Sequence, residues 1–281
     1  MARLEKTVPL IAAMVVMALT GGTMAAPLTA KTDPEALPGG TAAAGKTIAE
    51  AWLIAPTTRY DHFVHANRFE AGGVRARFPD GQVVTLLLPD TQVFEDSIVR
   101  LADLDQDGAD ELILVLSSLR EGAALAVLEV SPDGVAIAAQ TPFIGQRNRW
   151  LNPAGIADFD GDGRLEVALV QMPHLVRRLE LWRFERGQLA RVAALDDVSN
   201  HRLGTPQQSL AVVADFDGDA IADLAIPDGA RRVIRLLRFA GSAEEIARLP
   251  LPGEAVGDLR QAAPDAFTVR LSDGRRLTVA P

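Results

Sequence analysis

The sequence predicts an all-β protein, a β-propeller of about five four-stranded blades, and two periodic patterns carry this prediction. An acidic cluster occurs three times, and its first aspartates, Asp103, Asp158 and Asp215, lie 55 and 57 residues apart. Turn glycines recur independently every 53, 53 and 54 residues, with a fifth after 33: Gly81, Gly134, Gly187, Gly241 and Gly274. A fixed period near about 50 residues, with short strands between turns, is typical of radially repeated β structures.

Composition excludes several other classes of protein. The chain has 281 residues, of which 48% are apolar, so it is long enough to bury a substantial core. It contains no cysteine, which excludes disulfides, thiolate metal sites and a cysteine nucleophile. With 28 basic and 37 acidic side chains the formal charge is −9. This balance argues against nucleic acid or an anionic membrane as the main partner.

Residues 1–25 have the pattern of a secretory signal peptide. A basic start is followed by ten apolar residues, Leu10 to Leu19, and then by small residues. Ten residues are too few for a bilayer span, which needs about 20. We therefore expect cleavage after Ala25, a periplasmic or secreted location and no stable membrane span in the mature chain. An uncleaved anchor is the alternative.

Residues 26–46 are rich in Ala, Pro, Gly and Thr and lack periodic apolar positions, which predicts a flexible linker. Gly40 to Thr47 matches the phosphate-loop pattern GxxxxGK[ST], but no strand precedes it to aim the loop, so we expect no nucleotide site there. The remaining residues, 47–281, are predicted to form one propeller domain. Its repeats lie at about 97–141, 153–195 and 208–252.

Each repeat contains the pattern of four strands. In the first, residues 97–104 precede the acidic loop, and residues 112–116 form an apolar run typical of a strand that is covered on both faces. Residues 124–130 and 135–139 then form a hairpin around a Ser-Pro-Asp-Gly turn. The last repeat is short, and the early strand at residues 49–55 is a candidate to complete the final blade and remove its open edge.

The acidic loops, between strands one and two of three blades, are predicted calcium sites. Side chains at loop positions 1, 3, 5 and 9, with the carbonyl of position 7, supply the oxygen ligands that Ca²⁺ prefers. Carboxylates this close repel one another unless a cation lies among them. The predicted ligands for two or three Ca²⁺ ions are Asp103, Asp105, Asp107, Ala109 and Glu111; Asp158, Asp160, Asp162, Arg164 and Glu166; and Asp215, Asp217, Asp219, Ile221 and Asp223.

These loops differ from EF-hands and from one another. An EF-hand has a bidentate Glu at position 12, where this chain has Leu114, Leu169 and Ile226. Position 6 is glycine in the first two loops, which permits a positive φ, but it is Ala220 in the third. A left-handed alanine costs about 1–2 kcal/mol, so we expect the weakest calcium affinity in the third loop.

The repeated Asp-x-Asp-x-Asp-Gly-x-x-[Asp/Glu] loops resemble the FG-GAP (VCBS) repeats of integrin α-subunit propellers and of many exported bacterial proteins. The resemblance covers roughly residues 97–250. It implies a β-propeller with calcium in the loops that connect its strands. The Phe-Gly dipeptide of the family is largely missing, and integrin-like propellers usually have seven blades, so a role in cell adhesion is not carried over.

The opposite face of the predicted propeller collects polar and aromatic loop residues that suit a protein or carbohydrate ligand. They come from the blade entries and from one loop between strands two and three: Glu95, Asp96, Arg149, Trp150, Asn152, His174, Asn200 and His201. The alternative is that these are ordinary residues capping strand ends.

The sequence therefore predicts an exported, calcium-binding propeller that acts as a binding or scaffolding module. The alternative is a periplasmic hydrolase of glycoside type, with Glu95 or Asp96 and His201 as acid/base groups. Adjacent strand residues point to opposite faces, so this pair is poorly placed and no catalytic residue is assigned. Exposed carboxylates with shifted pKa values would favour the enzyme, and an apolar rim would favour the binding module.

Overall fold

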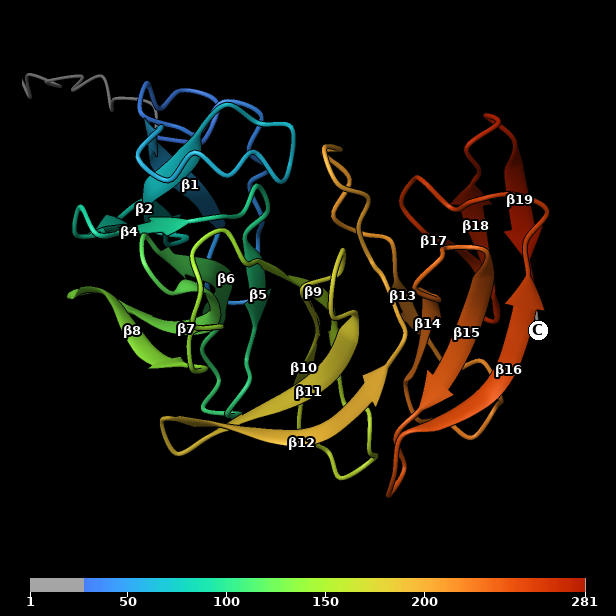
Figure 1. The fold of residues 1–281 in the computed structure, drawn as a ribbon. Coiled ribbons are helices and arrows are strands. Elements are labelled where there is room, and N and C mark those ends of the chain that lie inside the picture. The colour runs from blue at the N-terminus through green and yellow to red at the C-terminus, as the bar shows by residue number, and fades with distance from the viewer. Residues whose placement is uncertain (1–27, 281) are drawn as a thin grey trace, which may run out of the picture.

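The computed structural model describes residues 28–280, which form strands, bridges and turns and contain no helix. The protein is therefore all-β over this range, as predicted. None of these residues belongs to a helix that could cross a membrane. The predicted signal peptide, residues 1–25, lies outside the described residues. Four antiparallel sheets follow one another in chain order along a curved path (Figure 1).

The first sheet has eight strands, because a short strand joins two groups that the sequence predicts as separate blades. Strand β4 pairs with β2 through Ala71 and Phe94, and it also pairs with β6. The strands of this sheet are β1 (Glu50–Thr57), β2 (Glu70–Arg77), β3 (Val83–Leu87), β4 (Gln92–Phe94), β5 (Arg100–Ala102), β6 (Glu111–Ser118), β7 (Gly122–Ser131) and β8 (Gly134–Gln140).

The second and third sheets have four strands each and confirm the predicted hairpins. Their strands are β9 (Leu151–Ala157), β10 (Glu166–Gln171), β11 (Arg178–Glu185) and β12 (Gln188–Asp196), then β13 (Val212–Ala214), β14 (Asp223–Pro227), β15 (Val233–Arg238) and β16 (Glu244–Pro250). The hairpins β7–β8, β11–β12 and β15–β16 each contain a register shift, at Val127/Leu128, Leu181/Trp182 and Leu236/Leu237. This shared irregularity supports the repeat inferred from the sequence.

The last sheet has three strands, β17 (Arg260–Ala263), β18 (Ala266–Arg270) and β19 (Arg276–Val279). The prediction that residues 49–55 complete this sheet is wrong. They form β1, which pairs with β2 across seven residue pairs, from Glu50 with Arg77 to Thr57 with Glu70. The connection between β1 and β2, residues 58–69, is far shorter than the chain between β1 and the last sheet, so closing it costs less chain entropy. Among residues 28–280 no strand pair links the last sheet to the first.

The prediction of a flexible linker is wrong for residues 33–46, because this segment packs on the first sheet. Ala36 and Ala43 form bridges with Ile54 and Ala51 of β1. Leu37 is buried. The carboxylate of Asp33 accepts a hydrogen bond of 2.7 Å from the indole of Trp52, and it also contacts Arg75. A buried apolar side chain and a bonded carboxylate compensate for ordering a segment whose composition suggests a linker.

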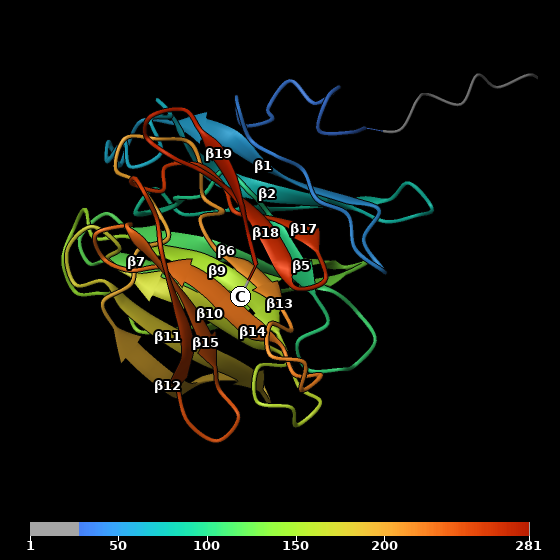
Figure 2. The same ribbon diagram turned by 90° about the vertical axis from the view of Figure 1, so that its right-hand side faces the viewer.

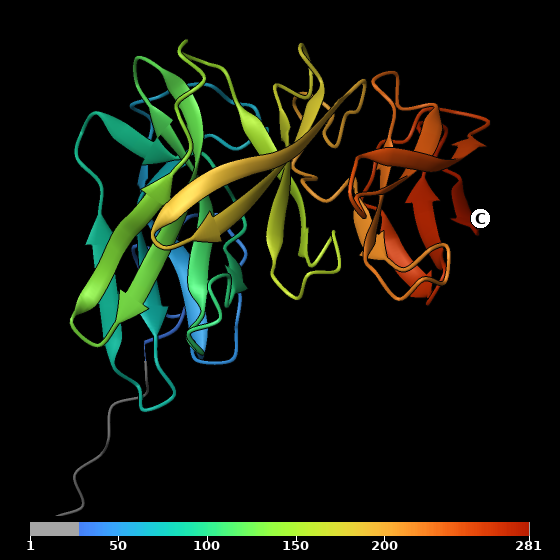
Figure 3. The ribbon, with the colours of Figure 1, turned by 90° about the horizontal axis from the view of Figure 1, so that it is seen from below.

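The sheets pack face to face, and the inner strands are buried on both sides. In β10, Val167 and Leu169 join the core shared with the first sheet, whereas Ala168 and Val170 join the core shared with the third. Alternate residues of a strand point to opposite faces, so one strand supplies both cores. Viewed from the last sheet, the strands of successive sheets lie one behind another (Figure 2). The view from below shows the same succession (Figure 3).

Candidate functional site

The three acidic loops have the same internal construction. The first aspartate accepts a hydrogen bond from the amide of position 6, at 3.1 Å from Gly108, 2.8 Å from Gly163 and 3.0 Å from Ala220. The carboxylate at position 9 accepts the amide of position 2, at 2.7 Å from Leu104, 3.0 Å from Phe159 and 2.8 Å from Phe216. These bonds close each loop and direct its carboxylates inward.

Three of the four predicted side-chain ligands converge in each loop. Oxygens of positions 1, 3 and 9 lie within 4.8 Å of one another in the groups Asp103, Asp105, Glu111; Asp158, Asp160, Glu166; and Asp215, Asp217, Asp223. The position 5 aspartates, Asp107, Asp162 and Asp219, are outside these groups and accept the amide two residues further along. Ligation by the carbonyls of Ala109, Arg164 and Ile221 stays a prediction.

The backbone of the third loop shows the strain predicted at position 6. Ala220 has a φ of 68°, in the left-handed region, like the equivalent glycines Gly108 at 94° and Gly163 at 88°. The loops also touch one another, since Gln106 donates to the carbonyl of Gly163. A Cβ on Gly161 would come within 2.8 Å of the side chain of Ile221, so glycine is needed there for this contact.

An arginine that the sequence analysis missed provides the counter-charge in the second loop. Arg183 lies opposite Glu166 in the pairing of β10 with β11. Its guanidinium contacts Asp160 at 2.7 Å, Asp162 at 3.0 Å and the buried Glu166 at 2.5 Å. In the third loop Arg238 reaches Asp217 at 3.4 Å. Within residues 28–280 no basic side chain pairs with a carboxylate of the first loop.

Electrostatics and unpartnered oxygens favour a cation in the first and third loops. Burial and the neighbouring aspartates raise the pKa of Glu111 to about 7 and that of Asp223 to about 6. One oxygen each of Asp103 and Asp223 is buried without a hydrogen-bond donor. Carboxylate oxygens of this kind are the ligands that a hard cation such as Ca²⁺ prefers. The second loop has Arg183 in this role, so the three loops are not equivalent.

The opposite ends of the strands bring the predicted ligand-face residues together. Ala157 pairs with Glu166 at the acidic end of β9 and β10, and Leu151 pairs with Gln171 at the other end. At that second end, Glu95, Asp96, Trp150, Asn152, Asn200 and His201 form a buried cluster, with His174 beside it. Arg149 lies at its edge and is half-buried.

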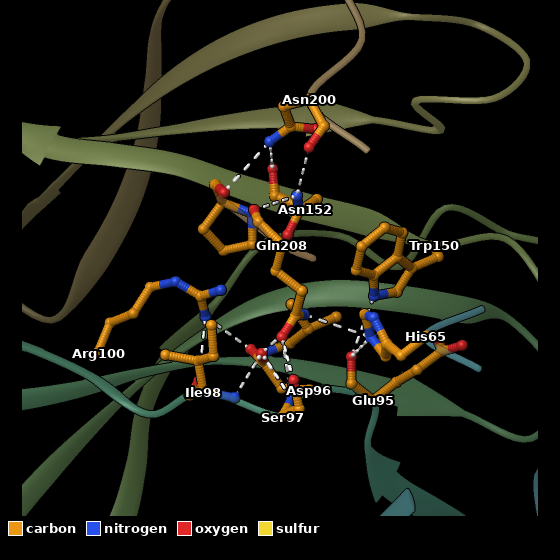
Figure 4. A network of polar contacts seen from close by, with 12 residues as sticks. His65, Glu95, Asp96, Ser97, Ile98, Arg100, Trp150, Asn152, Asn200 and Gln208 are labelled. Carbon is orange, nitrogen blue, oxygen red and sulfur yellow. Dashed lines mark hydrogen bonds and ion pairs between the residues drawn. The ribbon is translucent and has the colours of Figure 1, made fainter. Parts of the chain in front are cut away.

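A buried network of polar contacts holds this cluster (Figure 4). Gln208, which the sequence analysis did not select, donates to Asp96 at 3.1 Å and contacts Ser97. Arg100 pairs with Asp96 at 2.7 Å. The side chains of Asn152 and Asn200 each donate to the backbone carbonyl of the other. These bonds join the connections that enter the second and third sheets, although the side-chain oxygens of Asn152 and Asn200 remain buried without a donor.

All four histidines of the chain gather at this end, although the sequence analysis selected only His174 and His201. The ring centroids of His65 and Trp150 are 4.6 Å apart, and those of Trp150 and His201 are 4.9 Å apart. His174 and His201 approach to 2.9 Å between ring nitrogens. No spacing in the sequence links His62 and His65 to the others. The one feature of the sequence that could have drawn attention to them is that histidine is rare in this chain.

The two adjacent carboxylates, Glu95 and Asp96, share no partner. The carboxylate of Glu95 contacts His62 and accepts the Ser117 hydroxyl at 2.7 Å, whereas that of Asp96 faces Arg100 and Gln208. Both residues lie in the connection between β4 and β5, so the alternation predicted for a strand does not apply to them. Both are buried, and burial raises the pKa of Glu95.

An open pocket of about 270 Å³ lies beside the histidines. Three connections line it, those that contain residues 62, 172–175 and 203, together with residues 148–150 at the entry to β9. Its wall is mainly apolar, with Trp150, Met172, Pro173, Leu175 and Leu203.

Comparison with known proteins gives no family. No family model matches the chain, and no curated protein matches it. Among solved structures, rhamnogalacturonan lyase YesW aligns over 75% of this chain and 43% of its own, at 16% identity and a TM-score of 0.48. The exotype rhamnogalacturonan lyase YesX aligns over 81% and 52%, at 15% identity and a TM-score of 0.44. The chain spans about half the length of these enzymes, and the likeness assigns it neither activity nor substrate.

Replacing Arg183 tests whether this arginine takes the place of a cation. We expect Arg183→Met, measured in chelator by denaturant unfolding, to lower the free energy of unfolding by about 3 kcal/mol, because it leaves Glu166 buried and unpaired. Millimolar Ca²⁺ should then restore stability more in the variant than in the wild type. Arg186→Met is the control, because Arg186 is exposed. Equal calcium responses of Arg183→Met and the wild type would contradict this role.

The buried histidines predict a loss of stability in mild acid. Burial lowers the pKa of His65 to about 4 and that of His201 to about 3, against about 6.5 in the unfolded chain. Below pH 6.5 the unfolded chain binds these protons first, so stability falls as the pH drops toward 4. Each histidine contributes a slope of up to about 1.4 kcal/mol per pH unit. Denaturant unfolding in calcium at pH 7, 6 and 5 should show a shallower dependence in His65→Gln, and an unchanged slope would rule His65 out.

Proposed function

We propose that this chain is an exported, calcium-binding β-propeller that acts as a binding or scaffolding module for protein or carbohydrate ligands. The propeller is supported by four sheets that pack face to face in chain order and by hairpins that share a register shift. Apolar cores between successive sheets fit a radial arrangement. The resemblance of the acidic loops to FG-GAP repeats agrees with this proposal.

Calcium is proposed for the acidic loops because carboxylate oxygens are the ligands that this cation prefers. The first loop offers Asp103, Asp105 and Glu111, and the third offers Asp215, Asp217 and Asp223. Each set includes a buried oxygen without a donor, which fits a bound cation. When bound, Ca²⁺ would neutralise the mutual repulsion of these carboxylates and tie the entry of the second strand to the end of the first. Arg183 already pairs with the carboxylates of the second loop, so we place this loop last in affinity, in place of the third loop expected from Ala220.

The binding role rests on one observation, the apolar wall of the pocket at the opposite end. A rim of this kind favours a binding site over a centre of exposed, reactive carboxylates. Glu95 and Asp96, the two acidic residues predicted for this face, are buried and engaged with His62 and Arg100. Arg149, Trp150 and His174 are the predicted ligand residues that line the pocket.

One observation favours the second candidate, a hydrolase of glycoside type. His62 lines the pocket, and its Nδ1 contacts the buried carboxylate of Glu95. A carboxylate that fixes the tautomer and orientation of a histidine is a common arrangement for general acid–base catalysis. In this candidate Glu95 positions the imidazole of His62, and the acid/base roles first considered for Asp96 and His201 are dropped.

Calcium binding is tested by thermal unfolding of the purified protein in Ca²⁺, in Mg²⁺ and in chelator. A ligand that binds the native state alone raises the melting temperature with concentration. We expect a calcium-specific rise that Asp103→Asn reduces by at least half, because this change keeps an oxygen for the Gly108 amide but removes the charge. Asp133→Asn, in an exposed turn of the first sheet, is the control and should leave the rise intact. A melting temperature that does not respond to calcium would overturn the proposal.

Binding and catalysis are separated by one set of incubations with plant and bacterial polysaccharides and with extracellular proteins. We expect retention of the protein on at least one immobilised ligand without release of new reducing ends. Release of reducing ends that Glu95→Gln abolishes, in a variant of unchanged melting temperature, would establish the second candidate. If the protein is retained on no ligand and releases no reducing ends, both candidate functions are contradicted.

A further inference from the structure

Exposed apolar side chains gather around the pocket beside the histidines. Among residues 28–280, six large apolar side chains are strongly exposed, and two of them, Leu175 and Leu203, line this pocket with 62% and 63% exposure. Phe63 and Val176, two more of the six, adjoin lining residues in the chain. Apolar side chains that stay exposed together around a cavity mark a place where a ligand or partner covers them.

A cation without an acidic partner lies at the edge of the same pocket. The side chain of Arg149 makes one hydrogen bond, of 3.0 Å to the carbonyl of Asn148, and no carboxylate of the described residues lies within 4.0 Å of it. The neighbouring Arg147 is used differently, since it donates to the carbonyl of Tyr60 and lies over its ring. Arg149 is therefore available to pair with an anionic group on a ligand.

His62 adds a second polar group with a free ring nitrogen. Its Nδ1 contacts Glu95, and its Nε2 has no hydrogen-bond partner among the described residues. Two carboxylates lie against His62, and both are buried: Glu95 contacts Nδ1, and Glu70 accepts the His62 backbone amide at 3.3 Å. Neither lines the pocket, which presents Arg149 and the His62 edge to a ligand.

We propose that this pocket binds a small apolar carboxylate, with the apolar part against Leu175, Leu203 and Met172 and the carboxylate at Arg149. The volume of about 270 Å³ lies just below the range of about 300–1,000 Å³ that is usual for ligand sites, so the ligand is small. Charge decides between an acid and a neutral apolar molecule, because a cation in an apolar setting prefers an anion. The proposal deepens the binding function proposed above, since it names the ligand class of the same surface.

The test uses two matched probes, 4-phenylbutyrate and its neutral counterpart 4-phenylbutanol, titrated into the calcium-loaded protein by isothermal calorimetry. For a molecule of this size we expect a Kd for the acid on the order of 0.1–1 mM. The alcohol should bind at least tenfold more weakly. Equal affinity for both probes, or no binding of the acid, would overturn the proposal.

Three variants locate the binding. Arg149→Gln should weaken the acid about tenfold and leave the alcohol unchanged, because it removes the charge and keeps most of the chain. Leu203→Asp should weaken the acid at least tenfold, since it places a carboxylate in the apolar wall. Leu87→Asp is the matched control, because Leu87 is a leucine of 65% exposure in β3 and outside the pocket. Binding that survives Leu203→Asp would place the acid elsewhere and refute the assignment.

The same variants distinguish failure of this proposal from failure of the proposed function. If the acid does not bind, but Leu203→Asp abolishes retention on an immobilised protein or polysaccharide, the surface is a binding site and the ligand class is wrong. If neither the acid nor any macromolecule binds, the binding function itself is wrong.

Discussion

The inner strands of each sheet are buried on both faces, and the arrangement of the whole molecule depends on this two-sided burial. Strands such as β6 and β10 carry apolar residues at successive positions, so each face needs a separate partner. Successive sheets provide those partners on either side, which stacks the sheets in chain order. Stacking also aligns the strand ends, so that equivalent connections gather at one end or the other.

Charge is handled differently at the two ends. At one end, three similar acidic loops hold their carboxylates together by hydrogen bonds to their own backbone. Arg183 supplies the balancing charge in the second loop, and the buried oxygens of the other two still lack a partner. At the other end, carboxylates and histidines are buried in one network, and the burial holds three of the histidines neutral. The first end is suited to a cation, and the second joins connections from three sheets.

Most of the residues predicted to bind a ligand are buried in the polar network and do not line the pocket. Asn152 and Asn200 exchange hydrogen bonds across two connections, and Asp96 is engaged with Arg100 and Gln208. The accessible pocket is formed instead by Arg149, by the edges of His62 and His174, and by exposed leucines. The buried network fixes the backbone, and the side chains above it remain free to meet a ligand.

The sequence by itself determined the strands, the hairpins and the acidic loops, because these follow from patterns over a few residues. Alternation along a strand, a turn glycine and the closing bonds of the Asp103 loop are all local. The tertiary structure decided which distant residues meet: Arg183 opposite Glu166, β4 joining two groups of strands, β1 pairing with β2, and His62 beside Glu95. Such contacts depend on strand register and sheet packing, which a pattern of period two leaves open. For the same reason nothing in the sequence around Leu203 predicts that this loop residue lines the pocket.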